Sequence, residues 1–381
     1  MLKRYTSDGS GKKQLLAKIY TRKDHSILLS SIDKDAVRII RRLKREGYEG
    51  YIVGGAVRDL LKGIQPKDFD IATNALPKKI RHLFWNSRII GKRFKLVHIH
   101  FKDKIFEVST FRSADSTNVN NTFGAIEEDV KRRDFSMNAL YYNPINQQII
   151  DFVDGMKDIR EKRIRSLIPL DTTFKEDPVR IIRGIKYSAT TGFRIERKLK
   201  RSMAAHAELL ADCPSSRMTE ELFKILDSGS AKRIFKLFIE MKALKYILPF
   251  FSNEISSKKI KIHDFLNAVG KIDDQLPLNT SVDRGKSLHH ILLPFITYDH
   301  HDDVDLLFYD IFMKCKKILS PLTPPNVDIE EATRHIMTVL GIQIPHNRRL
   351  SIKKSKRKAL QKSAGPTHKR NNLVRHRKYR R

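Results

Sequence analysis

Two acidic side chains close together in the sequence are the residues of this chain best suited to chemistry. Asp68 and Asp70 stand in the run Pro66–Asn74, which reads PKDFDIATN. Because alternate residues of a strand point to one face, an extended backbone turns both carboxylates to one side and Phe69 to the other. Two like charges held this close disfavour each other unless a cation lies between them. Mg²⁺ commonly takes one or two carboxylates together with substrate phosphates, so the pair predicts a magnesium site.

A pair of glycines lies a short distance before these aspartates. Gly54 and Gly55 follow the apolar run Tyr51–Val53 and precede a helical pattern that Gly63 ends. Glycine allows a close approach of backbone to a ligand, and the helix that follows directs N–H groups at an anion. Arg58, one turn into that helix, is placed to reach a triphosphate. Either motif alone is common in ordinary turns, but together they predict the layout of a nucleotidyl transferase.

A predicted hairpin supplies a candidate third carboxylate. Residues 95–101 and 104–112 both alternate apolar and polar side chains, with a turn near Asp103. Glu107 lies within the second stretch, where a third metal-binding carboxylate and an ordinary solvent-facing residue are equally good interpretations. His98 and His100 share a strand face, but no third histidine or cysteine joins them in spacing, so we interpret them as ordinary strand residues.

The run Arg132–Leu140, which reads RRDFSMNAL, combines charged and amide side chains. We expect it to be helical, with Arg133 suited to phosphate or ribose oxygens. Asp134 is a candidate to accept a hydroxyl hydrogen bond or to assist the metal site. Asn138, one turn further, is expected on the same side as Asp134.

An aspartate and an arginine stand together at the start of a later predicted helix. Asp177 and Arg180 are three residues apart and therefore neighbours on one face, with Arg183 one turn further. An aspartate accepts hydrogen bonds and an arginine only donates them, which matches the pairing edges of adenine and cytosine and mismatches guanine and uracil. An unpaired buried polar group costs about 1–3 kcal/mol. The pair therefore predicts selection of A and C, without separating one from the other.

These motifs resemble the nucleotidyltransferase family that shares the DNA polymerase β head, and more narrowly its bacterial branch of poly(A) polymerases and CCA-adding enzymes. The resemblance rests on Gly54–Leu61 (GGAVRDLL), Pro66–Asn74, Arg132–Leu140 and Glu176–Arg180 (EDPVR). It departs at Ser136, where threonine is usual, and at the short loop 113–124, where poly(A) polymerases often carry a longer insertion. The run Ile89–His98 is similar to the segment that marks the poly(A) polymerases off from the CCA-adding enzymes.

The resemblance implies a role for each motif residue. It implies catalytic roles for Asp68, Asp70 and Asp134, with Mg²⁺ held by Asp68 and Asp70. It implies nucleotide binding by Gly54, Gly55, Arg58, Arg133, Asn138, Asp177, Arg180 and Arg183. The expected fold is an α/β head on a mixed sheet followed by an all-α neck and body. The expected domains are a basic leader (1–30), the head (31–165), a helical neck with the base-selecting motif (166–230), a helical RNA-binding body (231–345) and a disordered basic tail (346–381).

Charge points to a polyanion partner. The 381 residues include 75 Lys or Arg against 43 Asp or Glu, giving a net charge of +32, which favours nucleic acid. Residues 347–381 hold 15 of these cations and no acid, which leaves +17 for the rest (32 − 15). No apolar run approaches the roughly 18 residues of a membrane span. With no signal peptide pattern and two cysteines, Cys213 and Cys315, the sequence predicts a cytoplasmic protein without a membrane partner.

The expected activity is template-independent addition of AMP from ATP to RNA 3′ ends. One alternative is a CCA-adding or A-adding tRNA nucleotidyltransferase, and another is a non-catalytic RNA-binding protein that kept the head. The oligomeric state does not follow from the sequence.

Overall fold

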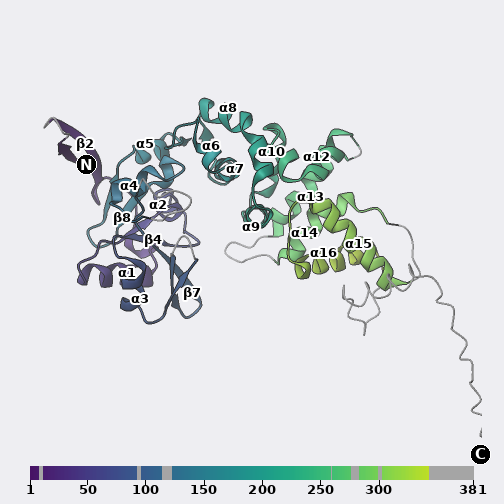
Figure 1. Ribbon diagram of the computed structural model, residues 1–381, viewed down its shortest axis with the longest axis horizontal. Helices are drawn as coiled ribbons and strands as arrows, with labels where there is room; N and C mark the ends of the chain where they lie inside the picture. The colour runs from purple at the N-terminus through teal and green to yellow at the C-terminus, as the bar shows by residue number, and fades with distance from the viewer. Residues whose placement is uncertain are drawn as a thin grey trace, which may run out of the picture. The chain divides into compact units, whose positions relative to one another are not determined.

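The computed structural model describes residues 1–7, 12–91, 96–113, 122–258, 260–275, 283–298 and 303–342. The chain divides into two compact units (Figure 1), one made of Met1–Cys213 with Glu240–Ala243 and the other of Pro214–Ile239 with Leu244–Arg381. The predicted basic tail, the loop residues 114–121 and the stretch 92–95 lie outside the described residues.

A nine-stranded sheet forms the centre of the first unit. Its strand order is β1-β2-β9-β8-β3-β4-β7-β6-β5, in which β4 and β7 are parallel and every other neighbouring pair is antiparallel. The strands are β1 (Leu2–Ser7), β2 (Lys13–Tyr20), β3 (Tyr51–Val53), β4 (Asp70–Thr73), β5 (Ser87–Ile90), β6 (Leu96–Phe101), β7 (Lys104–Thr110), β8 (Leu140–Asn143) and β9 (Gln148–Asp151). The mixed sheet confirms the predicted fold class.

The first residues of the chain belong to this sheet rather than to a separate leader. Strands β1 and β2 form an antiparallel pair, and β2 pairs in turn with β9. Ala17 and Tyr20 of β2 are buried. The expectation of a basic leader over residues 1–30 is therefore wrong, because the sequence alternation in β2 is weak and its pairing partner lies about 130 residues further along the chain.

Among the described residues of the head, five α-helices accompany the sheet. They are α1 (Lys34–Arg45), α2 (Gly55–Leu61), α3 (Pro77–Leu83), α4 (Ile126–Lys131) and α5 (Gly155–Arg160), and two 3₁₀ turns, η1 (Leu29–Ser31) and η2 (Ser136–Asn138), lie among them. Helix α1 begins at the cap Asp33, whose side chain accepts from the Asp35 N–H, and it buries one apolar stripe. Tyr51, Phe111 and Tyr141 pack together in the head core.

The first unit continues beyond the head with helices and one small strand pair. Its elements are β10 (Arg163–Ile164), α6 (Thr173–Glu176), α7 (Val179–Thr191), β11 (Arg194–Ile195), α8 (Arg197–Ala205) and η3 (Ala207–Asp212). Strands β10 and β11 pair in parallel. Helix α7 ends at Gly192, whose positive φ of 75° suits glycine and stops the helix.

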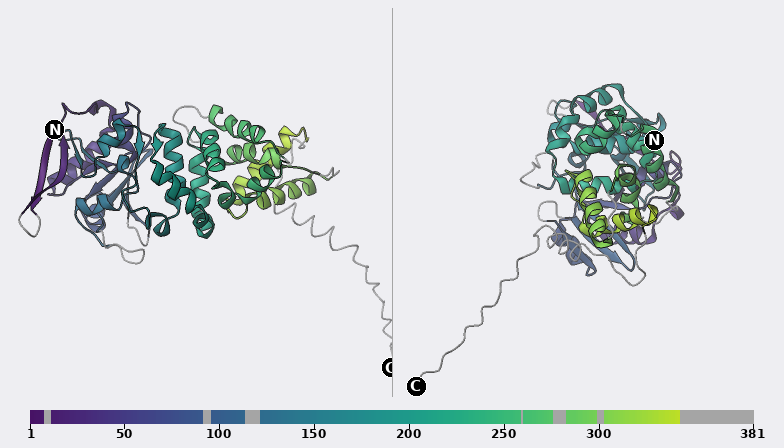
Figure 2. Two further views of the ribbon diagram at one scale, coloured as in Figure 1. Left: turned by 90° about the horizontal axis from the view of Figure 1, so that it is seen from above. Right: turned by 90° about the vertical axis from the view of Figure 1, so that its right-hand side faces the viewer.

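In its described residues, the second unit consists of helices and turns (Figure 2). They are α9 (Ser215–Leu226), α10 (Ala231–Glu240, of which Glu240 falls in the first unit), α11 (Leu244–Ile247), α12 (Pro249–Ser256), α13 (Ile262–Gln275), α14 (Arg284–Leu292), η4 (Leu293–Phe295), α15 (Val304–Leu319) and α16 (Asn326–Val339). Phe251, Phe265 and Phe295 form a packed aromatic cluster. The predicted helical body is confirmed. None of the helices in the described ranges combines the length and the apolar character that a membrane crossing requires.

Candidate active site

The two aspartates lie where β4 begins. Asp70 is the first residue of β4 and pairs with Val53 of β3, while Asp68 lies just before the strand. Both aspartates are exposed and Phe69 between them is 7% exposed. The alternation predicted from the sequence therefore holds, although Asp68 stands outside the strand proper. Phe69 packs inward, and its burial holds the two carboxylates on the solvent side.

Glu107 lies level with Asp70 on the neighbouring strand. The parallel pairing of β4 and β7 matches Ile71 with Val108, so the residues directly before them lie side by side. Glu107 is exposed, and its carboxylate lies 3.4 Å from His98 Nε2 across the β6–β7 pair. The candidate third carboxylate is thus next to the aspartate pair, in contact with a histidine.

Asp68, Asp70 and Glu107 together form an acidic corner. The negative charge of Asp70 is unfavourable there unless a cation pairs with it. Asp70 stays reachable from solvent, yet the protein atoms around its carboxylate displace enough water to disfavour the charged form. That burial, followed by the charges of Glu107 and Asp68, raises the pKa of Asp70 to about 6, against an opposing effect of Arg133. A hard divalent cation is what such a set of oxygens suits.

Within the described residues, no group of three or more His, Cys, Asp or Glu side chains is arranged to hold a metal ion. A cation held by two carboxylates, such as those of Asp68 and Asp70, would take its remaining ligands from water or a bound substrate.

The glycine turn adjoins these carboxylates. Gly54 precedes α2 with a φ of 72°, a backbone conformation that glycine adopts without strain. A Cβ atom built on Gly54 would lie 3.6 Å from Asp70 Oδ2. The backbone of the turn and the acidic corner therefore bound the same space, as the sequence motifs predicted together.

Arg58 lies beside the glycine turn and is held there by other side chains: a Cβ atom built on Gly55 would lie 3.4 Å from its Nη2. Its side chain is 8% exposed, and its Nη1 donates to Asn138 Oδ1 at 2.9 Å. Nε and Nη2 donate to the two oxygens of Asp59 at 2.9 Å and 3.0 Å. The guanidinium carbon also lies 5.4 Å from the centre of the Tyr187 ring. In these contacts Arg58 ties α2 to the turn η2 and to α7, and its binding of a triphosphate remains a prediction.

The segment that carries Asp134 and Asn138 is not the continuous helix expected from the sequence. Helix α4 ends at Lys131, Phe135 forms an isolated bridge with Ser166, and only the short turn η2 follows. The expectation that the two polar side chains share a helix face is wrong, because the buried Phe135 pulls the backbone into an extended conformation. Asp134 instead lies 3.0 Å from Arg183 Nη2 of α7, while Asn138 accepts from Arg58.

Arg133 lies between the head core and the acidic corner. Its Nε donates to Tyr141 Oη at 2.9 Å, and its Nη2 donates to Asp129 Oδ2 at 3.1 Å. Its positive charge partly opposes the rise in the pKa of Asp70. The structure thus brings Arg133, Asp70, Asp68 and Glu107 into one electrostatic neighbourhood.

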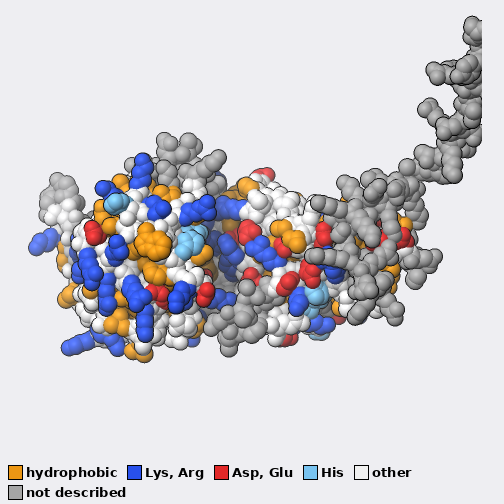
Figure 3. Space-filling model, turned by 90° about the horizontal axis from the view of Figure 1, so that it is seen from below, with side chains coloured by type: hydrophobic (Ala, Val, Ile, Leu, Met, Phe, Trp, Pro, Cys, Tyr) orange, Lys and Arg blue, Asp and Glu red, His pale blue; other side chains and the backbone are white. Residues whose placement is uncertain are grey.

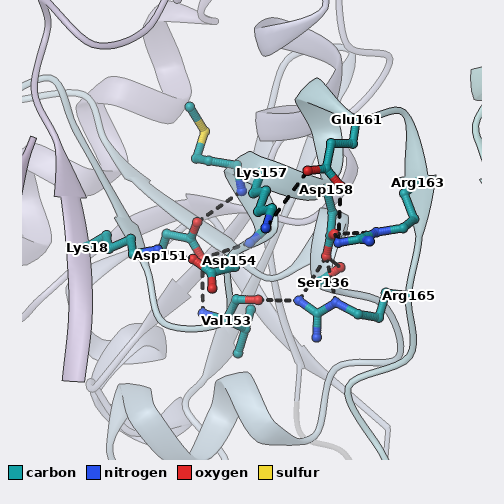
Figure 4. Close-up of polar contacts among 12 residues, drawn as sticks. Lys18, Ser136, Asp151, Val153, Asp154, Lys157, Asp158, Glu161, Arg163 and Arg165 are labelled. Atoms are coloured by element: carbon teal, nitrogen blue, oxygen red, sulfur yellow. Dashed lines mark hydrogen bonds and ion pairs between the residues drawn. The ribbon is translucent and has the colours of Figure 1, made fainter. Parts of the chain in front are cut away.

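A buried network of hydrogen bonds and ion pairs around Asp158 holds in place the segment that carries Ser136 (Figure 4). Asp158 of α5 is fully buried and accepts from Ser136 Oγ at 2.5 Å, from Arg163 Nη2 at 2.6 Å and from Arg165 Nε at 2.9 Å. Sequence patterns do not indicate this network, because Asp158 resembles any acidic residue on a charged helix. Its cations come from the chain that follows, and only the fold makes it an anchor.

Tyr187 is a second residue that the sequence motifs did not indicate. Its hydroxyl accepts from Arg183 Nη2 at 3.4 Å, and its ring lies against Arg58 and at a right angle to Phe135. Tyr187 therefore connects two of the predicted nucleotide-binding arginines. Its spacing of four residues from Arg183 on α7 was the only signal available.

The predicted base-selecting pair lies at the start of α7. Asp177 Oδ1 accepts from the Val179 N–H at 3.2 Å, and Arg180 donates to the Thr173 carbonyl oxygen at 2.8 Å and to Glu176 Oε2 at 3.1 Å. The Arg180 N–H donates to the Asp177 carbonyl oxygen at 3.1 Å, which sets the two residues on adjacent positions of one turn. Selection of a base by this pair remains a prediction.

Two protein-family models match parts of this chain. Residues 50–165 match the poly A polymerase head domain, and residues 192–255 match the model described as the probable RNA and SrmB-binding site of polymerase A. Poly(A) polymerase I of Escherichia coli O6:H1 is 39% identical over 247 residues, which are 61% of this chain and 53% of that protein. A CCA-adding enzyme of Geobacillus thermodenitrificans is 36% identical over 220 residues, which are 56% of this chain and 54% of that one.

A solved structure agrees with the fold. The Bacillus stearothermophilus CCA-adding enzyme, in complex with CTP, superposes with a TM-score of 0.58 and 27% identity, covering 82% of this chain and 71% of that one. The chain is thus similar to the poly(A) polymerases and to the CCA-adding enzymes over its head and the residues that follow it. Among the curated relatives, it is similar to poly(A) polymerase I of several bacteria. It spans about half the length of the curated relatives it matches.

Proposed function

We propose that this protein adds AMP from ATP to the 3′ ends of RNA without a template. The observation that carries the proposal is the placement of Asp70 beside both Gly54 and the other carboxylates, which suits a nucleotide triphosphate and a divalent cation together. The similarity to poly(A) polymerase I, in both the head and the residues that follow it, favours adenylate as the transferred group.

Asp68 and Asp70 are the residues proposed to hold Mg²⁺. The metal, when bound, supplies Lewis-acid polarisation of phosphoryl oxygens and orientation of the reacting groups. Glu107 lies beside them, where it either adds to the cation site or holds His98 in place. Asp134 is proposed to act through Arg183, with which it is paired, rather than by touching the metal.

The remaining residues are proposed to position the nucleotide. Backbone N–H groups of the Gly54 turn approach the phosphates, and Arg133 supplies positive charge on the same side. Arg58 and Asn138 hold the floor of the site through their mutual hydrogen bond. Asp177 and Arg180 offer an acceptor and a donor that match adenine, and they match cytosine equally well.

The test is a primer extension assay with a labelled single-stranded RNA, Mg²⁺ and each of the four nucleotides supplied separately. We expect extension with ATP and none with GTP or UTP, because the carbonyl and N–H of those bases leave the pair at α7 unmatched. Absence of extension with every nucleotide would contradict the proposal.

A second candidate is a CCA-adding or A-adding tRNA nucleotidyltransferase, which the 36% identity to a CCA-adding enzyme supports. A tRNA that lacks its 3′ end and is supplied with CTP alone separates the two activities. Incorporation of C would favour the tRNA enzyme, and extension of an unrelated RNA by ATP alone would favour the poly(A) polymerase. For a cytoplasmic enzyme of either kind, cellular RNA is the expected partner.

A further inference from the structure

The single tryptophan of this chain lies almost fully in solvent. Trp85 is 85% exposed and stands between α3 and β5, in the first unit. Large aromatic side chains are usually buried in the core of a domain, and an exposed one marks an interaction surface more often than an exposed leucine does. None of the contacts proposed for nucleotidyl transfer uses Trp85.

The backbone that carries Trp85 is held on both sides. Arg81 Nη1 of α3 donates to the Trp85 carbonyl oxygen at 3.1 Å. The His100 N–H of β6 donates to the Asn86 carbonyl oxygen at 2.9 Å, and the Asn86 side chain donates back to the His100 carbonyl oxygen. The ring is therefore displayed from a fixed turn, which lowers the entropy cost of stacking something on it.

Trp85 borders a hollow of about 480 Å³ that α1, the turn after α3 and the end of β6 enclose. Arg42, His100 and Lys102 line it, and among the described residues that form its wall none is acidic. Arg42 lies over the buried Phe84, 5.5 Å from the centre of that ring. Arg38 at the rim is paired with Asp35 at 2.8 Å, so the positive charge of the hollow rests mainly on the other cations.

The surface view agrees with this composition. In Figure 3, hydrophobic side chains on one face of the head lie among many Lys, Arg and His side chains and a few Asp and Glu side chains. A planar aromatic ring beside several positive charges suits single-stranded nucleic acid, because bases stack on the ring while phosphates lie near the cations. Trp and Arg are common in protein interfaces as well, but Lys is depleted there, so Lys102 in the lining favours nucleic acid over a protein partner.

We propose that Trp85, with Arg42 and Lys102, binds single-stranded RNA at a point separate from the site of transfer. Lys102 lies in the β6–β7 turn, and His100 of the hollow pairs with Ile105, two residues before Glu107 on β7. At about 3.3 Å per residue, the near wall of the hollow lies roughly 7 Å along the strand from the acidic corner, and Lys102 lies further away. The strand bound there is upstream of the reacting 3′ end. This inference rests on the proposed function for RNA as the polymer, and it adds a contact on the head itself, outside residues 192–255.

The lone tryptophan makes the test direct. Its fluorescence is measured in the full chain, with EDTA and without nucleotide, while a single-stranded oligoadenylate is added. Stacking of a base on Trp85 is expected to quench the emission in a saturable way, and added salt is expected to reverse it. Unchanged emission while the RNA is bound would overturn the proposal.

Variants make the same test by affinity. Trp85→Ala is expected to weaken oligoadenylate binding by about tenfold, Trp85→Phe to keep most of it, and Arg42→Gln to weaken it and reduce its salt dependence. Tyr5→Ala removes a different exposed aromatic side chain from the same unit and serves as the matched control. Equal affinity of Trp85→Ala and the unaltered protein would assign this face to a partner other than RNA and refute the inference.

The two proposals fail separately. If the chain transfers no nucleotide but its fluorescence is quenched by RNA, the proposed activity is refuted and the proposed RNA contact at Trp85 is not. A chain that extends primers with ATP but shows neither quenching nor an effect of Trp85→Ala retains the activity and loses this contact. For an active chain, Trp85→Ala is expected to raise the KM for long primers with little change in kcat.

Discussion

At the scale of single residues, the carboxylate of Asp70 is held where its charge is disfavoured. Burial among protein atoms, then the charges of Glu107 and Asp68, raise its pKa to about 6. The ionised form of Asp70 therefore lowers the stability of the folded chain. Functional sites commonly contain groups with shifted pKa values whose charges lower the stability of the fold. The same charge that weakens the apo fold prepares the site for a divalent cation.

Asp70→Asn tests whether the charge of Asp70 supports nucleotide transfer and lowers the stability of the fold. The variant keeps the shape of the side chain and removes its charge, so we expect nucleotide transfer to fall by about a thousandfold, as loss of several kcal/mol of metal-assisted stabilisation implies. Because the repulsion is also removed, the thermal midpoint is expected to stay the same or rise at pH 7. Primer extension and thermal unfolding measure the two effects.

Asp103→Asn is the control for that experiment, since Asp103 is an exposed acid in the β6–β7 turn. It is expected to leave both activity and midpoint unchanged. Full activity of Asp70→Asn would remove the basis of the metal site, and a large loss of thermal midpoint would show that Asp70 is structural instead.

At the scale of elements, the strand-turn-helix unit of β3 and α2 positions the site by its backbone. Gly54 and Gly63 bracket α2, with φ of 72° and 71°. Around Gly63 nothing lies within 4 Å of an added Cβ, whereas around Gly54 the Asp70 carboxylate does. The two glycines thus share a need for positive φ and differ in what surrounds them.

Substitution of alanine at each glycine separates strain from function. Gly63→Ala is expected to cost about 1 kcal/mol of unfolding free energy, and Gly54→Ala about 1–3 kcal/mol. Only Gly54→Ala is expected to lower nucleotide transfer as well, by raising the KM for ATP, because its methyl group meets the phosphate side of the site. Denaturant unfolding and steady-state kinetics check this, and an equal loss of activity in both variants would argue against a role for the turn.

The helices α14 and α16 hold a histidine cluster whose protonation state affects folding. His290 is buried, and its ring centre lies 3.9 Å from that of His289 with the two rings tilted by 38°. Its Nε2 lies 3.1 Å from Gln275 Oε1. Burial first, then the positive charges of His289, Lys271 and His335, lower the pKa of His290 to about 4. A histidine that stays neutral when folded but is protonated in the unfolded chain makes stability depend on pH.

The sign follows from the lowered folded-state pKa. The stabilising contribution is complete above the unfolded pKa of about 6.5 and is lost as pH falls from there toward 4, by roughly 2–3 kcal/mol. His290→Gln is expected to flatten this part of the profile, measured by denaturant unfolding between pH 4 and 7. His263→Gln, at an exposed histidine of the same unit, is the matched control and is expected to keep the slope of the unaltered protein. An unchanged slope in His290→Gln would contradict the assignment.

At the scale of the whole molecule, the net charge of +32 is the property most relevant to an RNA partner. Part of it is carried by residues 347–381, which fall outside the described structure. A chain ending at residue 346 carries +17 and is expected to bind RNA more weakly, with a shallower dependence of log affinity on log salt. Binding titrations over a range of salt measure the slope, and transfer of AMP to a short primer at low salt is expected to be unaffected. An unchanged slope would show that the tail does not touch RNA.

The sequence by itself determined the class of fold and the local geometry around the candidate residues of the site. The alternation around Phe69 and the glycine turn at Gly54 are local patterns, because strand periodicity and glycine dihedrals depend on neighbours only a few residues away. The tertiary structure alone decided the placement of the leader as strands β1 and β2, the break before Asn138 and the burial of Arg58. Each depends on a partner far along the chain, Asp151, Ser166 and Asn138 respectively, and the sequence contains no local signal for such contacts.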